Sequence, residues 1–396
     1  MKLILNILLI LIVGQIVKAQ DLEIGIMRSY SVSTLQLTHL SGNYVVYGDG
    51  VEVCRIKESQ SIALKRSGDF IKISQDGKTI GEHKSLKISE VNSGSSLKLQ
   101  ALAPSSHRLR KYKNDFRIET EGTSNLTVIN VVGIDHYLAG VIESEGGGGK
   151  DLEYYKVQAI LSRTYALDHL HKHAEDGFQL CGNVHCQAYH NMLRYTPDIG
   201  EAVSATQNLL MVGPDLKLAK SFFFANCGGQ TSESDFVWNR PIAYCKSVSD
   251  TFCIQSKQAN WTKKIKKSSW RNYMVNHFGF PEKDSVLGPL MFSFNQANRH
   301  AFYHLPRLGI PLRDIRIKFK LKSTWFSCSL QGDYVVLNGH GFGHGVGLCQ
   351  EGAMRMARLG YSYHQILNYY FTGIDIMTYQ EWLFLKQGSE ELNVGL

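Results

Sequence analysis

Residues 137–149 read YLAGVIESEGGGG, and residues 151–174 continue as DLEYYKVQAILSRTYALDHLHKHA. The second segment contains no Pro or Gly, and its apolar residues Val157, Ile160 and Leu161 recur at the spacing of one helical face. We therefore predict one long helix over 151–174.

Most of the remaining chain predicts short strands separated by Gly- and Asp-rich turns. Before the long helix, strands are predicted at 38–47, 70–74, 96–102 and 126–132. After it, the patterns predict strands at 219–225, 315–321 and 334–337 and helices at 349–359 and 363–371. Because the strands are segregated rather than alternating with helices, we expect an α+β fold. Its expected parts are a β-rich N-terminal lobe at 20–110, a mixed domain at 111–380 and a C-terminal tail at 381–396.

The first residues predict a signal peptide over 1–19. A positive start at Lys2 precedes the apolar run 3–17, and Val17-Lys18-Ala19 offers small residues for cleavage before Gln20. A membrane anchor is the alternative, but the run is shorter than the roughly 20 residues that span a bilayer. We expect export to the periplasm or the extracellular space, with no transmembrane span in the mature chain.

Composition adds limited information about partners. The chain holds 43 Lys and Arg against 35 Asp and Glu, a net charge of +8. This mildly basic balance suits an anionic envelope polymer, and it equally suits simple solubility. The sequence contains no basic block with interleaved aromatic residues, so we expect no nucleic-acid partner. The eight cysteines permit disulfides in an exported chain, and the first pairing we would expect is Cys245 with Cys253.

Glu145 is the first candidate for chemistry, because four glycines follow it directly. Such a segment suits a backbone that lies close to a bulky ligand, and the alternative is a flexible surface loop with a solvated carboxylate. We expect Glu145 near a helix N-terminus, where the dipole lowers a carboxylate pKa. An acid catalyst there would need burial to keep its proton.

Four residues of the types that bind zinc follow the long helix: His173, Cys181, His185 and Cys186. Two thiolates and two imidazoles are a tetrahedral ligand set. The alternative is a Cys181–Cys186 disulfide beside bystander histidines.

Two glycine-rich stretches complete the candidate sites. Residues 225–233, ANCGGQTSE, and the nearby Trp238, Tyr244 and Trp261 suit a groove for sugar rings, or else a turn beside core aromatics. Residues 339–347, GHGFGHGVG, hold two histidines on a tight backbone. These histidines could be metal ligands, an acid–base pair or hydrogen-bonding spacers, and we favour spacers.

Taken in order, these stretches resemble the SpoIID/LytB family of sporulation and cell-wall proteins. The motifs that carry the resemblance are YLAGVIESE at 137–145, EYYKVQAILSRTYA at 153–166, GHGVGLCQEGA at 343–353 and the segment 356–373. The similarity runs from about residue 112 to 376. The resemblance implies a SpoIID/LytB-like catalytic domain over 111–380, with the long helix lining a glycan-binding cleft. It also implies a strand that ends in the first motif.

The implied activity is that of a lytic transglycosylase acting on peptidoglycan glycan strands, with Glu145 as general acid and then base. No cofactor is implied for catalysis. A structural zinc is implied through Cys181, His185 and Cys186, with His173 a looser match. This chain departs from the family at Gly146-Gly147, where Met-Pro is usual, and at Leu348-Cys349, where Met-Ser is usual.

The roles we assign to other residues follow from this hypothesis. Lys156 and Arg163 would orient Glu145 or hold the lactyl carboxylate, and Asn226, His344 and Gln350 would contact sugar hydroxyls or acetamides. An alternative is a non-catalytic peptidoglycan-binding protein that enhances a partner amidase. A muramidase is a third interpretation and needs a second carboxylate. For that role Glu143 would share a face with Glu145 on an extended strand but lie too close to it, and Glu153 is a weaker candidate.

Overall fold

The computed structural model describes residues 21–394, with side chains as far as residue 388. The predicted signal peptide, 1–19, and its cleavage point lie outside the described residues. The chain folds into two compact units. Unit 1 comprises the described residues up to Gly148 together with His169–Gln207, and unit 2 comprises Gly149–Asp168 together with the described residues from Asn208 onward. The predicted α+β class is confirmed.

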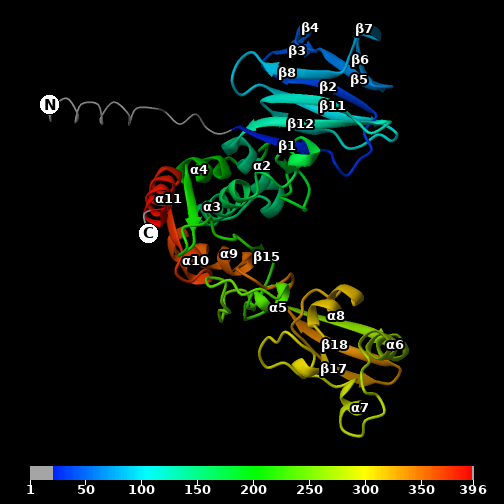
Figure 1. Ribbon diagram of the computed structural model, residues 1–396, viewed down its shortest axis with the longest axis vertical. Helices are drawn as coiled ribbons and strands as arrows, with labels where there is room; N and C mark the ends of the chain where they lie inside the picture. Colours follow the sequence, from blue (N-terminus) through cyan, green and yellow to red (C-terminus); the bar gives the residue numbers. More distant parts are fainter. Residues whose placement is uncertain (1–20, 395–396) are drawn as a thin grey trace, which may run out of the picture. The chain divides into compact units, whose positions relative to one another are not determined.

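Unit 1 is built on two sheets, whose strands β1 to β12 are coloured from blue to blue-green in Figure 1. The strand orders are β13-β1-β12-β11-β8-β3-β4 and β10-β9-β2-β5-β6-β7. Neighbouring strands are antiparallel except β1 and β13. The bounds are β1 (Asp21–Ile26), β2 (Thr34–Ser41), β3 (Tyr44–Gly48), β4 (Val51–Ile56), β5 (Ser61–Ser67), β6 (Phe70–Gln75), β7 (Lys78–His83), β8 (Ser85–Glu90), β9 (Ser96–Ala103), β10 (Arg110–Lys113), β11 (Asp115–Glu121), β12 (Asn125–Gly133) and β13 (Leu180–Cys181).

Alternating side chains explain why the two sheets pack together. On β6, Ile71 and Ile73 are fully buried while Phe70 is exposed, and on β8 the residues Leu86 and Ile88 are buried in the same manner. Strand β6 contacts both β8 and β11 of the other sheet, so the two apolar faces meet in one core.

Three of the four strands predicted before the long helix are confirmed, at 70–74, 96–102 and 126–132. The fourth, 38–47, is two strands, β2 and β3. The chain turns between them at Gly42.

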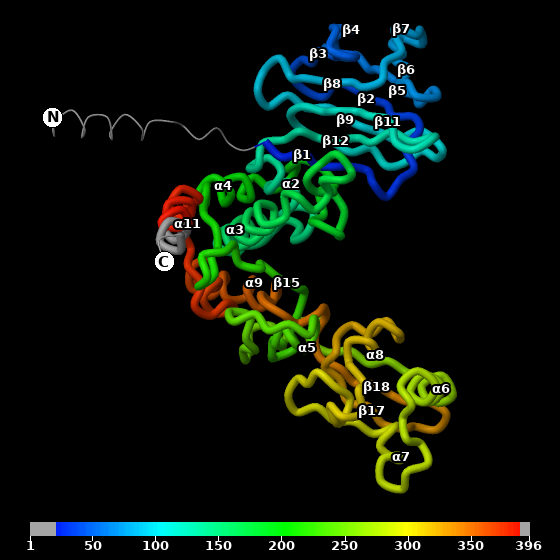
Figure 2. The backbone as a smooth tube through the Cα atoms, viewed as in Figure 1, coloured from blue at the N-terminus to red at the C-terminus, as the bar shows by residue number. Residues whose placement is uncertain are grey.

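Helix α2 (Ile134–Gly146) follows β12 directly and packs against α4 (Pro197–Ala205) (Figure 2). The expectation that YLAGVIESE ends a strand is therefore wrong. Tyr137, Leu138 and Val141 are all completely buried, and their spacing of three to four residues fits one face of a helix. A run in which small and polar residues separate these apolar positions does not alternate as a half-buried strand would.

In unit 2, helix α3 (Leu152–Asp168) packs against β14 (Leu209–Val212), α9 (Gln350–Arg358) and α10 (Tyr363–Tyr370). The long helix is confirmed, but it ends at Asp168 and not at 174. Asp168 is paired with Lys220 of unit 2 at 2.6 Å, whereas the chain from His169 onward belongs to unit 1. A short 3-10 helix, η1 (Ala174–Asp176), follows.

Unit 2 also contains a three-stranded sheet, ordered β16 (Asn260–Lys266), β18 (Tyr334–His340) and β17 (Phe326–Gln331). Helices α6 (Lys267–Phe278) and α8 (Leu312–Phe319) accompany it. Its core includes Trp270, Tyr303 and Phe326, all fully buried. The strand predicted at 315–321 is wrong, because this segment lies mostly in α8. Ile315 is buried there, but Ile317 is 67 % exposed, so the apparent alternation of β-branched residues did not mark a sheet face.

The predicted helices at 349–359 and 363–371 and the strand at 334–337 are confirmed, whereas the strand predicted at 219–225 shrinks to β15. The segment predicted as a C-terminal tail is helical as far as Val394. The remaining bounds are β15 (Phe223–Phe224), α5 (Asp235–Trp238), α7 (Leu287–Leu290), η2 (Pro306–Leu308), β19 (Leu348–Cys349), β20 (Asp375–Thr378) and α11 (Tyr379–Val394).

Candidate functional site

Glu145 lies in the last turn of α2, one residue before the helix ends at Gly146. The side chain is half-buried, and its Oε1 accepts a hydrogen bond from the backbone N–H of Ala188 at 2.9 Å. Burial raises the pKa of Glu145, and the hydrogen bond from Ala188 opposes this increase. Within unit 1 Glu145 therefore lies at a helix C-terminus, not at the expected N-terminus, and the dipole of α2 also disfavours the charged carboxylate.

The segment that presents the Ala188 amide is packed tightly onto α2. A Cβ atom on Gly140 would lie 2.3 Å from the carbonyl oxygen of Asn191 and 2.6 Å from the ring of Tyr189. Only glycine allows this close approach. The buried Tyr189 hydroxyl also donates to Asn130 Oδ1 at 3.0 Å. The N–H group that binds the catalytic candidate is thus held by packing and not by a mobile loop.

Glu143, two residues earlier on the same helix, has a different environment. It is 9 % exposed and accepts hydrogen bonds from the backbone N–H groups of Arg194 and Tyr195, at 3.2 and 2.8 Å, and from Arg194 Nε at 3.2 Å. The expectation that it shares a face with Glu145 is wrong, because positions i and i+2 of a helix point to different sides. Glu143 fixes the segment at 194–195 and is fully occupied by that task.

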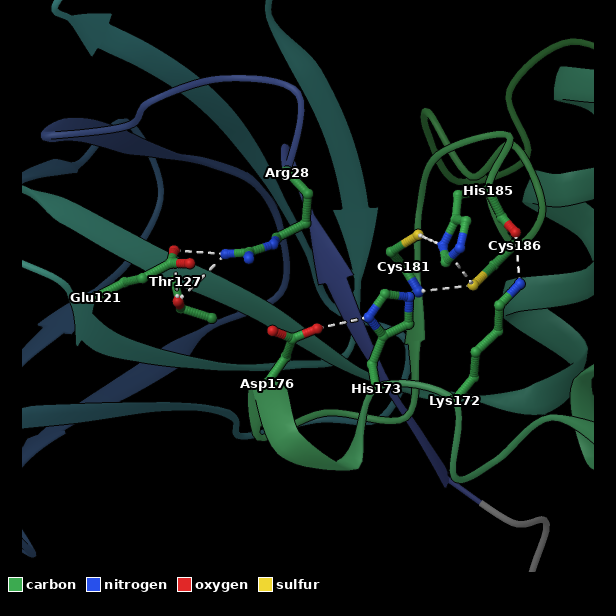
Figure 3. Close-up of polar contacts among 9 residues, drawn as sticks. All are labelled: Arg28, Glu121, Thr127, Lys172, His173, Asp176, Cys181, His185 and Cys186. Atoms are coloured by element: carbon green, nitrogen blue, oxygen red, sulfur yellow. Dashed lines mark hydrogen bonds and ion pairs between the residues drawn. The ribbon is translucent and has the colours of Figure 1, made fainter.

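The four predicted zinc ligands come together in unit 1 (Figure 3). One ligand atom from each of His173, Cys181, His185 and Cys186 lies within 4.8 Å of the others. His185 Nδ1 is 3.8 Å from the sulfur of Cys181 and 4.0 Å from that of Cys186. These separations are close to the roughly 3.6 Å edge of a tetrahedron with zinc-to-ligand distances of about 2.0–2.3 Å. Both cysteines are free thiols rather than a disulfide.

The orientation of His173 favours a ligand role. Its Nδ1 contacts Asp176 Oδ2 at 2.7 Å, an acid the sequence analysis did not single out. A carboxylate on the second nitrogen is the usual partner of a metal-binding histidine. His173 Nε2 is buried and has no hydrogen-bond partner in the described chain. A metal ion would satisfy this nitrogen.

This cluster is joined directly to the Glu145 environment by the backbone. Cys186 is two residues before Ala188, whose N–H binds Glu145. At the other side, Cys181 lies on β13, which pairs with β1 at Gly25. The cluster therefore links the edge of the sheet to the segment that orients Glu145.

In unit 2 the two glycine-rich stretches form one structure. Strands β15 and β19 pair in parallel, with Phe223 opposite Leu348. Asn226 and Phe342 exchange two backbone hydrogen bonds, at 3.0 and 2.7 Å. Residues more than a hundred positions apart thus form a single local arrangement.

Asn226 and Glu351 form the polar centre of this arrangement. Asn226 is fully buried, and its Nδ2 donates to Glu351 Oε2 at 2.5 Å and to Ser256 Oγ at 2.7 Å, while its Oδ1 accepts from Gly228 N–H at 2.6 Å. Glu351 also accepts from Ser256 Oγ and from Gln258 Nε2 at 2.8 Å. In this structure both ends of the Asn226 amide are engaged inside the protein, so it positions Glu351 and does not face a ligand. The sequence analysis missed Glu351, although it follows Gln350 in the quoted motif.

His344 has the geometry of a hydrogen-bonding spacer. Its Nε2 is 3.0 Å from the carbonyl oxygen of Phe223, and its Nδ1 accepts from the Val346 N–H at 3.1 Å. Burial lowers the pKa of His344 to about 4, so the ring is neutral at pH 7. Gln350 is half-buried at the start of α9, with Nε2 3.5 Å from Tyr154 Oη.

The two cations predicted on the long helix differ in exposure. Lys156 is half-buried and pairs with Glu153 at 2.6 Å. Arg163 is only 2 % exposed, and its Nη1 donates to the carbonyl oxygen of Leu209 on β14 at 3.3 Å. Glu153 in turn accepts from the Tyr363 N–H at 2.6 Å, so it anchors α10.

The aromatic residues proposed for a sugar groove separate into two kinds. Trp261 and Tyr244 are buried, whereas Trp238 is 40 % exposed and packs on Phe222.

The predicted site residues are divided between the two units. The structure places Asn226, His344 and Gln350 in one unit with Lys156 and Arg163, and it places Glu145 and the four predicted metal ligands in the other unit.

Known proteins are similar to this chain in the region that holds these features. Residues 122–212, which include Glu145 and the four Cys and His residues, match the family model described as SpoIID, Stage II sporulation protein. The chain is 26 % identical over 270 residues to Stage II sporulation protein D of Bacillus subtilis, covering 64 % of this chain and 77 % of that protein. It is 24 % identical over 295 residues to the amidase enhancer of the same organism, covering 61 % of this chain and 40 % of the relative. An uncharacterized protein of Brachyspira hyodysenteriae is 27 % identical over 258 residues, which are 64 % of this chain and 69 % of that one.

Over residues 122–212 the chain therefore matches the SpoIID family, and the proteins it is similar to include a stage II sporulation protein D and an amidase enhancer. Among the helices of the described residues, none combines the length and the apolar character needed to cross a bilayer.

Proposed function

We propose that this protein is an exported lytic transglycosylase that cleaves peptidoglycan glycan strands between N-acetylmuramic acid and N-acetylglucosamine. The observation that carries the proposal is the half-buried Glu145 carboxylate, whose pKa is raised by burial and whose partner is the single Ala188 amide. A general acid needs to hold its proton near the working pH, and burial favours that form.

The proposed reaction uses one carboxyl group twice. Protonated Glu145 donates its proton to the glycosidic oxygen as the bond from C1 of the muramic acid breaks. The C6 hydroxyl of the same sugar then bonds to C1, and its proton returns to Glu145. The product ends in a 1,6-anhydro ring and no water is consumed. Because the nucleophile belongs to the substrate, positioning replaces a second protein carboxylate.

The neighbouring acids support a mechanism with one carboxyl group. A hydrolase of the common kind needs a second carboxyl group about 5–9.5 Å away. On α2 the other nearby acid is Glu143, which is already bound to Arg194 and Tyr195. Glu153, the other candidate, is engaged by Lys156 and by the Tyr363 amide.

The proposal includes a structural zinc at His173, Cys181, His185 and Cys186. When bound, the ion would crosslink the segment 173–186 through four protein ligands and leave no open position for a water nucleophile. Cys186 is two residues before Ala188 in the chain, so the ion would help to hold the amide that orients Glu145. His173 Nε2, buried without a partner, supports this assignment.

The deciding experiment is mass spectrometry of purified glycan strands, with and without stem peptides, after incubation with wild type and Glu145→Gln. Glu201→Gln is a matched control, because Glu201 is exposed on α4 of the same unit. We expect anhydro-muramic ends from wild type and the control but not from Glu145→Gln. Full activity of Glu145→Gln would overturn the assignment of the catalyst.

The second candidate is a non-catalytic glycan-binding protein that enhances a partner amidase, favoured by the amidase enhancer among its relatives and by Gly146-Gly147 beside Glu145. Strand binding by both proteins without any cleavage, together with stimulation of a cell-wall amidase, would establish this function instead. Reducing ends would indicate a hydrolase.

A further inference from the structure

A second group of metal-binding side chains lies inside unit 2, where neither the predicted nor the proposed function uses it. One ligand atom from each of Cys227, Asp250, Cys253 and Cys349 lies within 4.8 Å of the others. All four residues are at most 1 % exposed. The pairing that the sequence suggested, Cys245 with Cys253, does not form, because Cys253 lies beside Cys227.

The sulfur and oxygen atoms of this group are close enough to share one ion. The sulfur of Cys227 is 3.2 Å from that of Cys253 and 3.2 Å from Asp250 Oδ2. The sulfur separation is well beyond the roughly 2.05 Å of a disulfide. It is nearer to the roughly 3.8 Å edge of a tetrahedral thiolate site.

Backbone N–H groups point at the sulfur atoms, as expected for thiolates. Cys349 Sγ accepts from the N–H groups of Cys227 at 3.3 Å and Gly352 at 3.4 Å, and Cys227 Sγ accepts from Gly229 N–H at 3.4 Å. Cys349 is the N-cap of α9, where the helix dipole stabilises a negative charge.

Asp250 is held in position by its own neighbours. Its Oδ2 accepts from the Tyr370 hydroxyl at 2.9 Å, and its Oδ1 accepts from the Phe252 N–H at 2.9 Å. A Cβ atom on Gly352 would lie 2.4 Å from Asp250 Oδ2, so this glycine leaves room for the carboxylate. Such support for a ligand is typical of built metal sites.

The buried cation Arg299 lies beside this group and favours a negative charge there. Arg299 is 6 % exposed, and its Nη2 donates to the carbonyl oxygen of Cys227 at 2.7 Å, while its Nη1 has no hydrogen-bond partner among the described residues. A buried guanidinium is normally compensated by an anion. Three thiolates and a carboxylate around one divalent ion leave a net negative charge, part of which Arg299 would balance.

We propose that Cys227, Asp250, Cys253 and Cys349 bind a second metal ion, a thiophilic divalent ion of the zinc class. Three sulfur donors and one oxygen donor suit tetrahedral Zn²⁺ and exclude Mg²⁺ or Ca²⁺, which prefer oxygen ligands. Binding displaces the thiol protons and joins three segments distant in sequence. The ion therefore ties the loop after β15 and the loop at 250–253 to the start of α9. This inference does not depend on the reaction proposed for Glu145.

The test is the metal content of the exported full-length protein, purified without chelators, by elemental analysis and native mass spectrometry. Wild type is expected to hold about two zinc ions per chain, and Cys253→Ser about one. Cys245→Ser is the matched control, because Cys245 is also fully buried but lies outside both groups; it should keep about two. Cys181→Ser should lose the other ion, so failure of one site is distinguishable from failure of the other.

A second measurement, made on wild type and Asp250→Asn, covers the case in which Cys253→Ser does not fold. After denaturation and alkylation, all eight cysteines should react, and cobalt substitution should give thiolate charge-transfer absorption that Asp250→Asn perturbs. Equal zinc in wild type and Cys253→Ser would overturn the proposal. So would a native mass about 2 Da lower that maps to a Cys227–Cys253 disulfide.

Discussion

Glu145 in unit 1 and Glu351 in unit 2 are both half-buried acids in glycine-rich motifs, yet their surroundings differ. Glu145 accepts one backbone hydrogen bond, whereas the Glu351 carboxylate is bound by Asn226, Ser256 and Gln258. The three donors hold the Glu351 carboxylate inside the packed arrangement of unit 2, while burial raises the pKa of Glu145, which has one backbone donor. We infer that the number of donors, rather than the motif, distinguishes the acid proposed as catalyst from the acid that supports the structure.

The strongest way to sharpen this comparison is to neutralise each acid separately. Glu145→Gln should reduce turnover of glycan strands about 10³-fold, because a general acid is lost, while its stability stays near that of wild type. Glu351→Gln should keep most of the turnover per folded molecule. Initial rates and denaturant unfolding of both variants would check this. Equal losses of turnover in the two would remove the distinction.

Removing the zinc proposed for unit 1 should have the next largest effect. We expect Cys186→Ser to bind about one zinc ion less and to lose about 10–100-fold in turnover, because the segment that carries the Ala188 amide then keeps its packing but loses the crosslink of the ion. Elemental analysis and rate measurements would check this. Unchanged turnover in protein that is shown to lack the ion would mean that the cluster does not support the activity of Glu145.

Truncation should reveal the structural role of Glu351. Glu351→Ala should lower the free energy of unfolding by about 2 kcal/mol, because the buried Asn226 amide loses its carboxyl acceptor. Denaturant unfolding followed by fluorescence would measure it. The exposed Glu201 offers a control, since Glu201→Ala should change stability by less than about 0.5 kcal/mol. A similar small change in Glu351→Ala would contradict its supporting role.

The smallest effect should be a pH dependence of stability. Burial raises the pKa of Glu145 in the folded state, so folding favours the protonated acid. This contribution is fully present below the unfolded pKa and is lost as the pH rises through the folded pKa. Glu145→Gln cannot ionise, so it should become more stable than wild type over that rise, by less than about 1 kcal/mol. If the stability difference between Glu145→Gln and wild type is the same at every pH, the pKa of Glu145 is not raised by folding.

The sequence predicted the elements that carry their own periodicity. Val157, Ile160 and Leu161 marked α3, and the strands with alternating burial were found in the same way. It did not predict where α3 ends, because the end depends on the contact of Asp168 with Lys220, which is distant in sequence. Helix α2 was missed because small residues such as Gly140, required by the packing of Tyr189, interrupt its apolar face.

The sites were predictable to the extent that their residues are close in sequence. His173, Cys181, His185 and Cys186 lie within one short segment, and the structure brings them together. Cys227, Cys253 and Cys349 gave no such signal, since they are far apart in the sequence. The pairing of β15 with β19 brings Cys227 to Cys349, and the loop at 250–253 places Cys253 beside Cys227. The assignment of Asn226 to sugar binding also required an exposed side chain. The sequence does not reveal exposure, and in the structure Asn226 is fully buried.

Unit 1 is interrupted by α3, which belongs to unit 2, and its sheets continue beyond residue 110 because β11 pairs with β8 and β12 with β1. During synthesis, the ribosome must therefore release the chain as far as Gln207 before unit 1 has all its residues. A protease fragment ending near residue 150 would hold Glu145 but lack β13 and Ala188. In evolution, the N-terminal lobe could not be exchanged between relatives by recombination at residue 110 without breaking its own sheet.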